Sequence, residues 1–434
     1  MDYQLQKRLY NECNPDQPLD PGDRRNLNID KSDVRGERWS DRIAGRIEKS
    51  NVPVCELFTG LRGTGKSTEL RRLAERLADP KRMHLLTVLI DADEVLDITQ
   101  EIDVSDLLSF ILYNAEREVL AKEDKDPRVP PDGPFGRVWN WLSKTDVELQ
   151  KVSAAPAGVG FELSFKHNPT LRQQVRKTVS AHLSTFVRQV REELIVLEER
   201  AKAVGYSGLV IIFDSLEKLR GASSTWLDVL ASAERIFGGG APHVQLPVHV
   251  LYTVPPALSR RMNDPISFLP MIKVRTQEGL THKPGMDVIV NLVRLRIPAE
   301  ALTELFGAGA EDDRIHQIGL WSGGYPREIV RVLQTILEEE EFPLSLGRVE
   351  KILERSGNTY RSIAYGSRAL PWLGTVARSK KLICSSAADE EAADFLLSNN
   401  VIMRYLNDTE WVDVHPSIAG LPELAEPVPS SKPT

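Results

Sequence analysis

The chain has few cysteines, and their spacing suits neither a set of disulfides nor a zinc site. Only three occur, Cys13, Cys55 and Cys384, an odd number spread far apart along the sequence. This arrangement excludes a disulfide framework, and it lacks the close spacing of a zinc site. We therefore expect three free thiols in a reducing compartment.

Long apolar runs and a surplus of basic residues are also absent. No stretch approaches the roughly 18 apolar residues of a membrane-spanning helix, and the N-terminus lacks the apolar centre of a signal peptide. The formal net charge is -7, so the total shows no basic footprint of a nucleic-acid-binding protein. These features predict a cytoplasmic protein with no membrane partner, and they leave a local basic face open.

The order of apolar and polar segments predicts an α/β protein of two or three domains. Short apolar strands are expected at 54–59, 85–90, 208–214, 248–254 and 271–274. Helical segments separate these strands, which is typical of a doubly wound parallel sheet. From about 284 to 357 the pattern is helical, and two short strands with an Asn407-Asp408 turn are expected near the end of the chain.

One segment carries a specific chemistry. Residues Gly60-Leu61-Arg62-Gly63-Thr64-Gly65-Lys66-Ser67 match the pattern G-x-x-x-x-G-K-[ST], after an expected strand and before an expected helix. The glycines allow backbone N–H groups to point at phosphate oxygens, and the helix N-terminus adds positive potential. Lys66 is placed to reach the β- and γ-phosphates and Ser67 to ligate Mg²⁺, with Thr68 following in the same turn. The segment therefore predicts a site for ATP and Mg²⁺.

A second part of the site is expected at the end of the strand at 208–214. Asp214 ends this buried strand, which is the usual place of the acid that holds the Mg²⁺ shell. Many such enzymes carry a Glu directly after this Asp, whereas here Ser215 follows and the first acid is Glu217. Glu217 is the candidate base that activates water, and its alternative is a solvent-facing Glu paired with Lys218.

Two later polar residues are candidates for sensing the γ-phosphate. Thr253 ends the next expected strand, although a Thr in a strand is often only a strand residue. Arg327 lies in the first turn of a helix that begins after the turn Ser322-Gly323-Gly324-Tyr325-Pro326. The alternative for Arg327 is an exposed side chain at an ordinary helix start.

Taken together, these motifs resemble the AAA+/STAND branch of P-loop ATPases. The triplet Gly324-Tyr325-Pro326 is similar to the G-x-P turn of STAND proteins, whose proline packs near the adenine, and Arg327 resembles the helix-start arginine called sensor 2. The segments Asn14–Leu19 and Val34-Arg35-Gly36 look like the lead-in of a bacterial AAA family found in conflict or defence gene clusters, which implies Arg35 near the adenine.

The resemblance implies a domain organisation. It implies a parallel sheet in the order 5-1-4-3-2, a helical lid and a C-terminal winged helix. The expected boundaries are an extended arm at 1–34, a core at 35–283 with a helical insertion at about 120–205, a lid at 284–357, a winged-helix-like unit at 358–425 and a disordered tail at 426–434.

The resemblance also implies a nucleotide-driven switch that forms a homo-oligomer on binding ATP. Arginines from a neighbouring subunit often activate this class, and Arg260 and Arg261 are candidates, with a solvated surface pair as the alternative. No second effector motif is visible, so a separate effector protein is expected. Slow or partner-activated hydrolysis follows from the missing acid at 215.

Two other functions stay open. A DNA-loaded ATPase of the origin-recognition or transposition-regulator kind is suggested by the expected winged helix and by the basic residues Lys166, Arg172, Arg176 and Lys177. Acidic residues on the same helical stretch favour a solvated helix face instead. A non-hydrolysing nucleotide-binding scaffold is the third interpretation, because no Glu follows Asp214.

Overall fold

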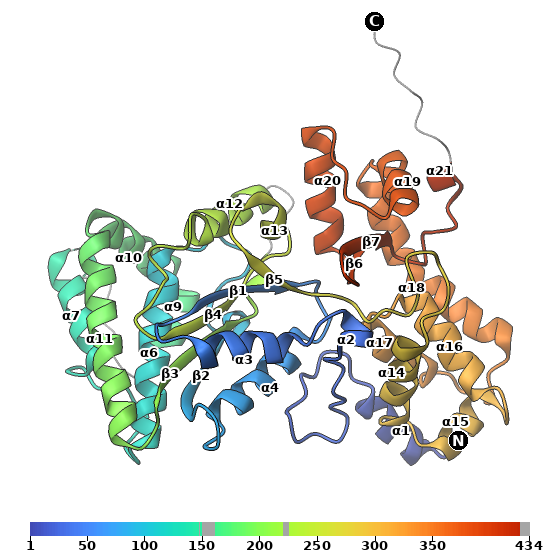
Figure 1. Ribbon diagram of the computed structural model, residues 1–434, viewed down its shortest axis with the longest axis horizontal. Coiled ribbons are helices and arrows are strands. Elements are labelled where there is room, and N and C mark those ends of the chain that lie inside the picture. The colour runs from blue at the N-terminus through green and yellow to red at the C-terminus, as the bar shows by residue number, and fades with distance from the viewer. Residues whose placement is uncertain (147, 150–160, 220–224, 426–434) are drawn as a thin grey trace, which may run out of the picture. The chain divides into compact units, whose positions relative to one another are not determined.

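The computed structural model describes residues 1–146, 148–149, 161–219 and 225–425 (Figure 1). The tail expected at 426–434 lies outside these residues. The chain divides into two compact units. We call residues 1–39, 60–69 and 269–434 the loop unit, and residues 40–59 and 70–268 the sheet unit.

A five-stranded sheet forms the centre of the sheet unit. Its strands are β1 (Cys55–Gly60), β2 (Leu85–Asp91), β3 (Gly208–Asp214), β4 (His249–Thr253) and β5 (Ile266–Leu269). Their order is β2-β3-β4-β1-β5, and β1 with β4, β2 with β3, and β3 with β4 pair in parallel. Read from the other edge, this is the order 5-1-4-3-2 of the P-loop NTPase fold, which the resemblance implied. All of β3 except its last residue is buried, which agrees with its continuous apolar sequence.

The expected strand at 271–274 is wrong, because β5 ends before it. Pro270 follows β5, and the next three residues bond to segments that are remote in sequence. The N–H groups of Met271, Ile272 and Lys273 donate to the carbonyls of Arg404, Gly324 and Val34. The apolar run is therefore buried by tertiary contacts within the loop unit and not by the sheet.

Helices cover both faces of the sheet. Figure 1 shows α3 (Trp39–Lys49) and α4 (Lys66–Ala78) on one side, and α12 (Trp226–Phe237) with α13 (Leu258–Arg261) on the other. The short helix α5 (Ala92–Val95) follows β2, and the 3₁₀ turn η1 (Leu216–Lys218) follows β3.

A bundle of helices lies beside β2 and β3 (Figure 1), and its first helix begins before residue 120, where an insertion was expected to start. Its helices are α6 (Val104–Lys122), α7 (Pro134–Thr145), α9 (Phe161–His167), α10 (Pro169–Ala181) and α11 (Leu183–Ala203). The long helix expected at 171–203 is therefore broken, and His182 is the residue between its two parts. Packed aromatic rings, including Phe110, Phe135 and Phe161, fill the bundle, so the insertion has an apolar core that is continuous with that of the sheet.

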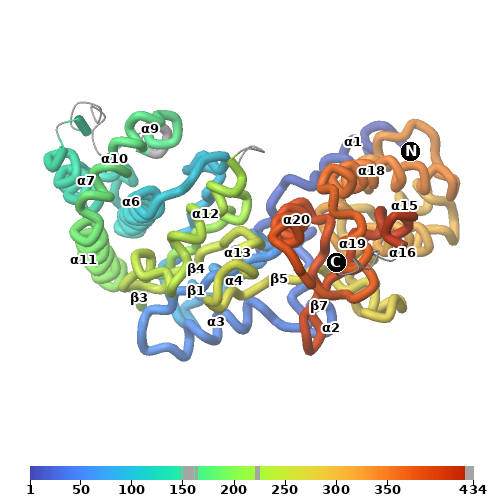
Figure 2. The backbone as a smooth tube through the Cα atoms, turned by 90° about the horizontal axis from the view of Figure 1, so that it is seen from above, coloured from blue at the N-terminus to red at the C-terminus, as the bar shows by residue number. Residues whose placement is uncertain are grey.

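The loop unit contains the chain's first residues and its C-terminal part. The first 34 residues, expected to be extended, include α1 (Tyr3–Glu12) and most of α2 (Ser32–Arg35). Figure 1 shows α1 near α15, and the amino group of Met1 lies 2.6 Å from the carboxylate of Glu304. The structure as a tube, seen from above, is in Figure 2. The other helices are α14 (Lys283–Arg294), α15 (Ala299–Phe306), α16 (Glu311–Ser322), α17 (Pro326–Ile336) and α18 (Leu346–Gly366).

The C-terminal elements are α19 (Leu370–Ser379), α20 (Ala387–Ser398), the antiparallel hairpin of β6 (Ile402–Leu406) and β7 (Glu410–Val414), and α21 (Pro422–Ala425). Helices followed by a two-stranded hairpin are the element order expected for a winged helix. The boundary expected between 357 and 358 falls inside α18, so one continuous helix spans it. Among the described residues, no helix is long and apolar enough to span a membrane.

Candidate nucleotide-binding site

The glycine-rich segment forms a loop between β1 and α4, which is the candidate phosphate loop. Gly60 ends the strand and Lys66 begins the helix, with Ser67 and Thr68 in its first turn. Gly63 and Gly65 have φ angles of +83° and +95°, a backbone conformation that side chains other than glycine rarely adopt. The motif requires glycine at position 65, whereas Gly63 occupies one of its variable positions. Two left-handed glycines in one loop can direct backbone N–H groups toward a phosphate chain.

Lys66 lies folded over this loop. Its ammonium nitrogen donates to the carbonyls of Gly60 at 2.9 Å and Leu61 at 3.0 Å, and the side chain is buried. The hydroxyl of Thr64 also donates to the Leu61 carbonyl, at 2.9 Å. The loop thus holds the lysine against the backbone that would surround a phosphate, where its charge is available to phosphate oxygens.

The turn before α17 packs directly on the loop. A Cβ atom placed on Gly63 would lie 2.5 Å from Cε2 of Tyr325 and 2.9 Å from Cβ of Arg327. Tyr325 is buried, and burial raises the pKa of its phenol to about 12. Pro326 occupies the first helical position of α17, as the sequence predicted. The Gly-x-Pro turn and the phosphate loop are therefore neighbours in the loop unit.

The guanidinium of Arg327 is directed at the N-terminal arm. Its Nε atom donates to the carbonyl of Pro15 at 3.2 Å and lies 3.9 Å from the carboxylate of Asp16. In this arrangement the Cβ atom of Arg327 lies near the loop, while its guanidinium contacts residues 15 and 16. A role in γ-phosphate sensing therefore requires Arg327 to leave these partners.

Two contacts to the loop came from residues remote in sequence. Asn400, two residues after the end of α20, donates from Nδ2 to the Arg62 carbonyl at 2.9 Å. The Nη2 atom of Arg35 donates to the Thr64 carbonyl at 2.5 Å. Sequence reasoning missed Asn400, because nothing local marks an Asn after a helix as a partner of residue 62. Arg35 was expected near the adenine, and its Nη2 contacts the loop backbone.

The turn after β3 is built by a hydrogen bond from the neighbouring strand. Asp214 ends β3, and its Oδ1 accepts from the N–H of Ser215 at 2.6 Å. Ser215 is buried with a φ of +68°, an unfavourable conformation for a residue with a Cβ atom. The hydroxyl of Thr253 accepts from the N–H of Leu216 at 2.9 Å and donates to the Phe213 carbonyl at 3.4 Å. Thr253 therefore supports the turn that carries Asp214.

The acids near this turn come from η1, β2 and α5. Glu217 lies in η1, partly exposed, whereas Lys218 pairs with Asp93 at 3.1 Å and not with Glu217. Asp91, the last residue of β2, is the register partner of Asp214. Its place at the end of an apolar strand was visible in the sequence, but its position opposite Asp214 needed the strand order.

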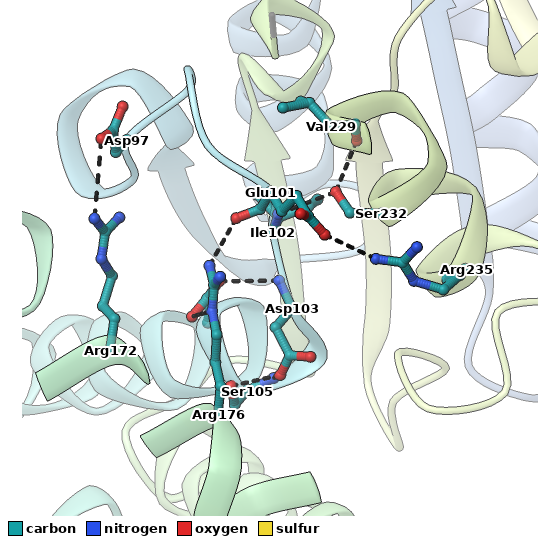
Figure 3. A network of polar contacts seen from close by, with 11 residues as sticks. Asp97, Glu101, Ile102, Asp103, Ser105, Arg172, Arg176, Val229, Ser232 and Arg235 are labelled. Atoms are coloured by element: carbon teal, nitrogen blue, oxygen red, sulfur yellow. Dashed lines mark hydrogen bonds and ion pairs between the residues drawn. The ribbon is translucent and has the colours of Figure 1, made fainter. Parts of the chain in front are cut away.

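The basic residues that suggested DNA binding are largely engaged within the sheet unit. Lys166 donates to the carbonyls of Asp93 at 2.7 Å and Glu94 at 3.0 Å. Figure 3 shows Arg172 directed at Asp97, and Arg176 directed at the loop that precedes α6. Arg176 pairs with the buried Asp106, whose pKa is raised by burial although Arg176 opposes the shift, whereas Lys177 is exposed. These contacts attach α10 to the core.

The candidate activating arginines lie on α13, after β4. Arg261 is 3.7 Å from the carboxylate of Glu234 on α12. Arg260 precedes it in the same short helix. Among the described residues, no group of three or more His, Cys, Asp or Glu side chains is arranged to hold a metal ion.

Comparisons with known proteins give distant structural likenesses only. No protein-family model and no curated protein matches the sequence. Among solved structures, a Walker-type ATPase of Pyrococcus abyssi is 17% identical with a TM-score of 0.41, over 92% of this chain and 98% of that one. Cdc6p of Pyrobaculum aerophilum is 11% identical with a TM-score of 0.30, over 96% of each chain.

Proposed function

We propose that this protein is an ATP-binding switch of the AAA+ type that hydrolyses ATP slowly or on activation. The observation that carries the proposal is the loop from Gly60 to Ser67, with its two left-handed glycines and its buried Lys66 at the start of α4. Such a loop recognises the phosphates of a nucleotide through backbone N–H groups and a lysine.

From the sequence pattern we propose Ser67 and Asp214 as the residues that would hold Mg²⁺. The hydroxyl of Ser67 is in the first turn of α4, and Asp214 ends a buried parallel strand. Bound Mg²⁺ neutralises charge on the transferred phosphate. The left-handed Ser215 occupies the place where many ATPases carry a Glu, so Glu217 is the acid we propose for orienting water.

A switch also needs contacts that differ between its two states. The loop is touched by Tyr325 in the lid and by Asn400 in the C-terminal part. Phosphates entering the loop change the surroundings of both residues. We propose that this coupling drives ATP-dependent oligomerisation, and that a separate effector, in a pathway of the conflict or defence kind, responds to it.

The first test measures ATP turnover and particle mass for the wild type and Lys66→Ala. The wild type is expected to bind and turn over ATP and to gain mass with it, and the variant to lose all three. Binding by the wild type without turnover would replace the switch by the non-hydrolysing scaffold. Unchanged binding in the variant would remove the loop from nucleotide recognition.

Turnover of Glu217→Gln then decides the role of the acid. A carboxylate that orients water is expected to contribute roughly a hundredfold or more to the rate, while ATP affinity stays unchanged. An unchanged rate in the variant would exclude Glu217 and leave Asp91 as the next acid to test at this edge of the sheet.

The DNA-loaded ATPase is less well supported. The helix α20, which precedes the C-terminal hairpin, carries four acids, Asp389, Glu390, Glu391 and Asp394, and no basic residue. Negative charge at this position opposes contact with phosphates. We expect no salt-dependent binding of duplex DNA, with or without ATP, and anisotropy of a labelled duplex at two salt concentrations checks this.

A further inference from the structure

Arg35 is a charged side chain with no exposure to solvent. A buried charge loses its hydration, so it needs hydrogen bonds or an opposite charge within the protein. It is the last residue of the short helix α2, which stops at Gly36 with a φ of +82°. The fully buried guanidinium lies behind the phosphate loop. Its Nη2 atom donates to the Thr64 carbonyl, and a Cβ atom on Gly65 would lie 3.9 Å from the same nitrogen.

The second partner of Arg35 lies on the helix that follows the loop. Glu69 is in the first turn of α4, is also buried, and its carboxylate is 3.9 Å from Nη1 of Arg35. The N–H of Glu69 donates to the Gly65 carbonyl at 3.0 Å, so the first turn of this helix is hydrogen-bonded to the loop. One guanidinium therefore contacts both the middle of the loop and the helix that continues it.

Arg35 is flanked by contacts to the segment that follows β5 and to the C-terminal hairpin. The carbonyl of Val34 accepts from the N–H of Lys273 at 3.1 Å. A Cβ atom on Gly36 would lie 2.6 Å from the carbonyl oxygen of Leu406 in β6, so the backbones approach closely there. Arg35 thus links these two segments to the phosphate loop inside one compact unit.

The direction of the Arg35 contact decides its role. Phosphates are bound by backbone N–H groups of such a loop, while Arg35 donates to a carbonyl, on the side of the peptide that does not face phosphate. Its fork geometry suits two partners at once, and a lysine would not reproduce it. Loss of this contact frees a loop whose conformation must be set before phosphate binds.

We infer that Arg35 and Glu69 form a positioning pair that holds the phosphate loop in its binding conformation, and that affinity for the phosphate chain depends on this pair. The inference rests on the proposed nucleotide site. The inference gives Arg35 no contact with the base of the nucleotide. Changing the pair must therefore weaken the binding of a ligand that has phosphates but no base by the same factor as the binding of ATP.

The test measures the dissociation constants of ATP and of inorganic tripolyphosphate, each with Mg²⁺, by calorimetry. The proteins are the full-length wild type, Arg35→Lys, Arg35→Ala, Glu69→Gln, Lys66→Ala, and Arg8→Ala as a control at an exposed arginine of α1 in the same unit. Melting temperatures without ligand and kcat and KM for ATP are recorded for each.

We expect Arg35→Lys and Glu69→Gln to raise both dissociation constants by the same factor, roughly tenfold, through the loss of a buried contact. KM rises with them and kcat changes little, while Arg8→Ala behaves as the wild type. If Arg35→Ala does not fold, the two conservative variants still decide the result.

Two results would overturn the inference. A rise for ATP with none for tripolyphosphate would assign Arg35 to the base. A lower melting temperature with both dissociation constants unchanged would make the pair structural only. These outcomes differ from failure of the proposed function, in which the wild type itself binds neither ligand or Lys66→Ala binds both as tightly.

Discussion

At the scale of the residue, the hydroxyl of Thr253 has two candidate roles, as a sensor of the γ-phosphate or as a support of the turn after β3. As a sensor it would act only with a γ-phosphate present, whereas in the structure it bonds to Leu216 and Phe213 in the turn after β3. Thr253→Val keeps the shape and leaves the buried N–H of Leu216 unsatisfied, so we expect a loss of about 1–3 kcal/mol in the free energy of unfolding. Chemical denaturation without nucleotide measures it.

Thr253→Ser is the matched control, because it keeps the hydroxyl and is expected to retain most of that stability. Turnover of Thr253→Val should fall while ATP affinity stays, since the displaced turn carries Asp214. Wild-type stability together with reduced turnover would return Thr253 to the role of a sensor.

At the scale of the element, a buried acid makes the helical insertion sensitive to pH. Glu116 on α6 is buried and accepts from the N–H of Phe135 on α7 at 2.7 Å. Burial, only partly opposed by that bond, raises its pKa from 4.5 to about 7. The folded state therefore holds a proton that the unfolded state releases, and stability is full below pH 4.5 and falls as pH rises to about 7.

The expected size of this loss is about 3 kcal/mol, from a pKa difference of about 2.5 at about 1.36 kcal/mol per unit. Glu116→Gln should remove the slope and be more stable than the wild type at pH 8, as denaturation at pH 5 and pH 8 measures. Glu118→Gln, a half-exposed neighbour on α6, serves as the control and should keep the wild-type slope. An equal slope in Glu116→Gln and the wild type would assign the pH dependence to other groups.

At the scale of the whole molecule, the proposed oligomer predicts that subunits share a site. If Arg260 or Arg261 acts on the nucleotide of a neighbour, the double variant Arg260→Ala/Arg261→Ala binds ATP but turns it over slowly. Lys66→Ala lacks nucleotide but keeps both arginines. Mixing the two inactive proteins should restore a fraction of wild-type turnover.

The concentration dependence of the mixture checks the mechanism, because an assembled oligomer is favoured by mass action. The matched negative control mixes Lys66→Ala with Lys66→Ala/Arg260→Ala/Arg261→Ala, in which no subunit can bind ATP. No recovery in the first mixture, with mass increase intact, would place the activating arginine elsewhere.

Several features of this protein could be predicted from the sequence because they depend only on neighbouring residues. The loop at 60–67, its strand and helix, and the apolar strand ending at Asp214 follow from short-range patterns of glycine spacing and hydrophobicity. The order of the sheet was implied by resemblance and is confirmed by strand pairing. These features need no knowledge of what packs against them.

Long-range packing determines which remote residues contact the loop. The contacts of Arg35 and Asn400 with loop carbonyls join segments 29 and 338 positions apart, and no local pattern encodes such a pairing. The wrong prediction of a strand at 271–274 has the same origin, because an apolar run predicts burial but does not indicate which segment will pack against it. Local patterns specify backbone conformation and chemistry, whereas long-range packing determines which charges face one another and which buried groups find partners.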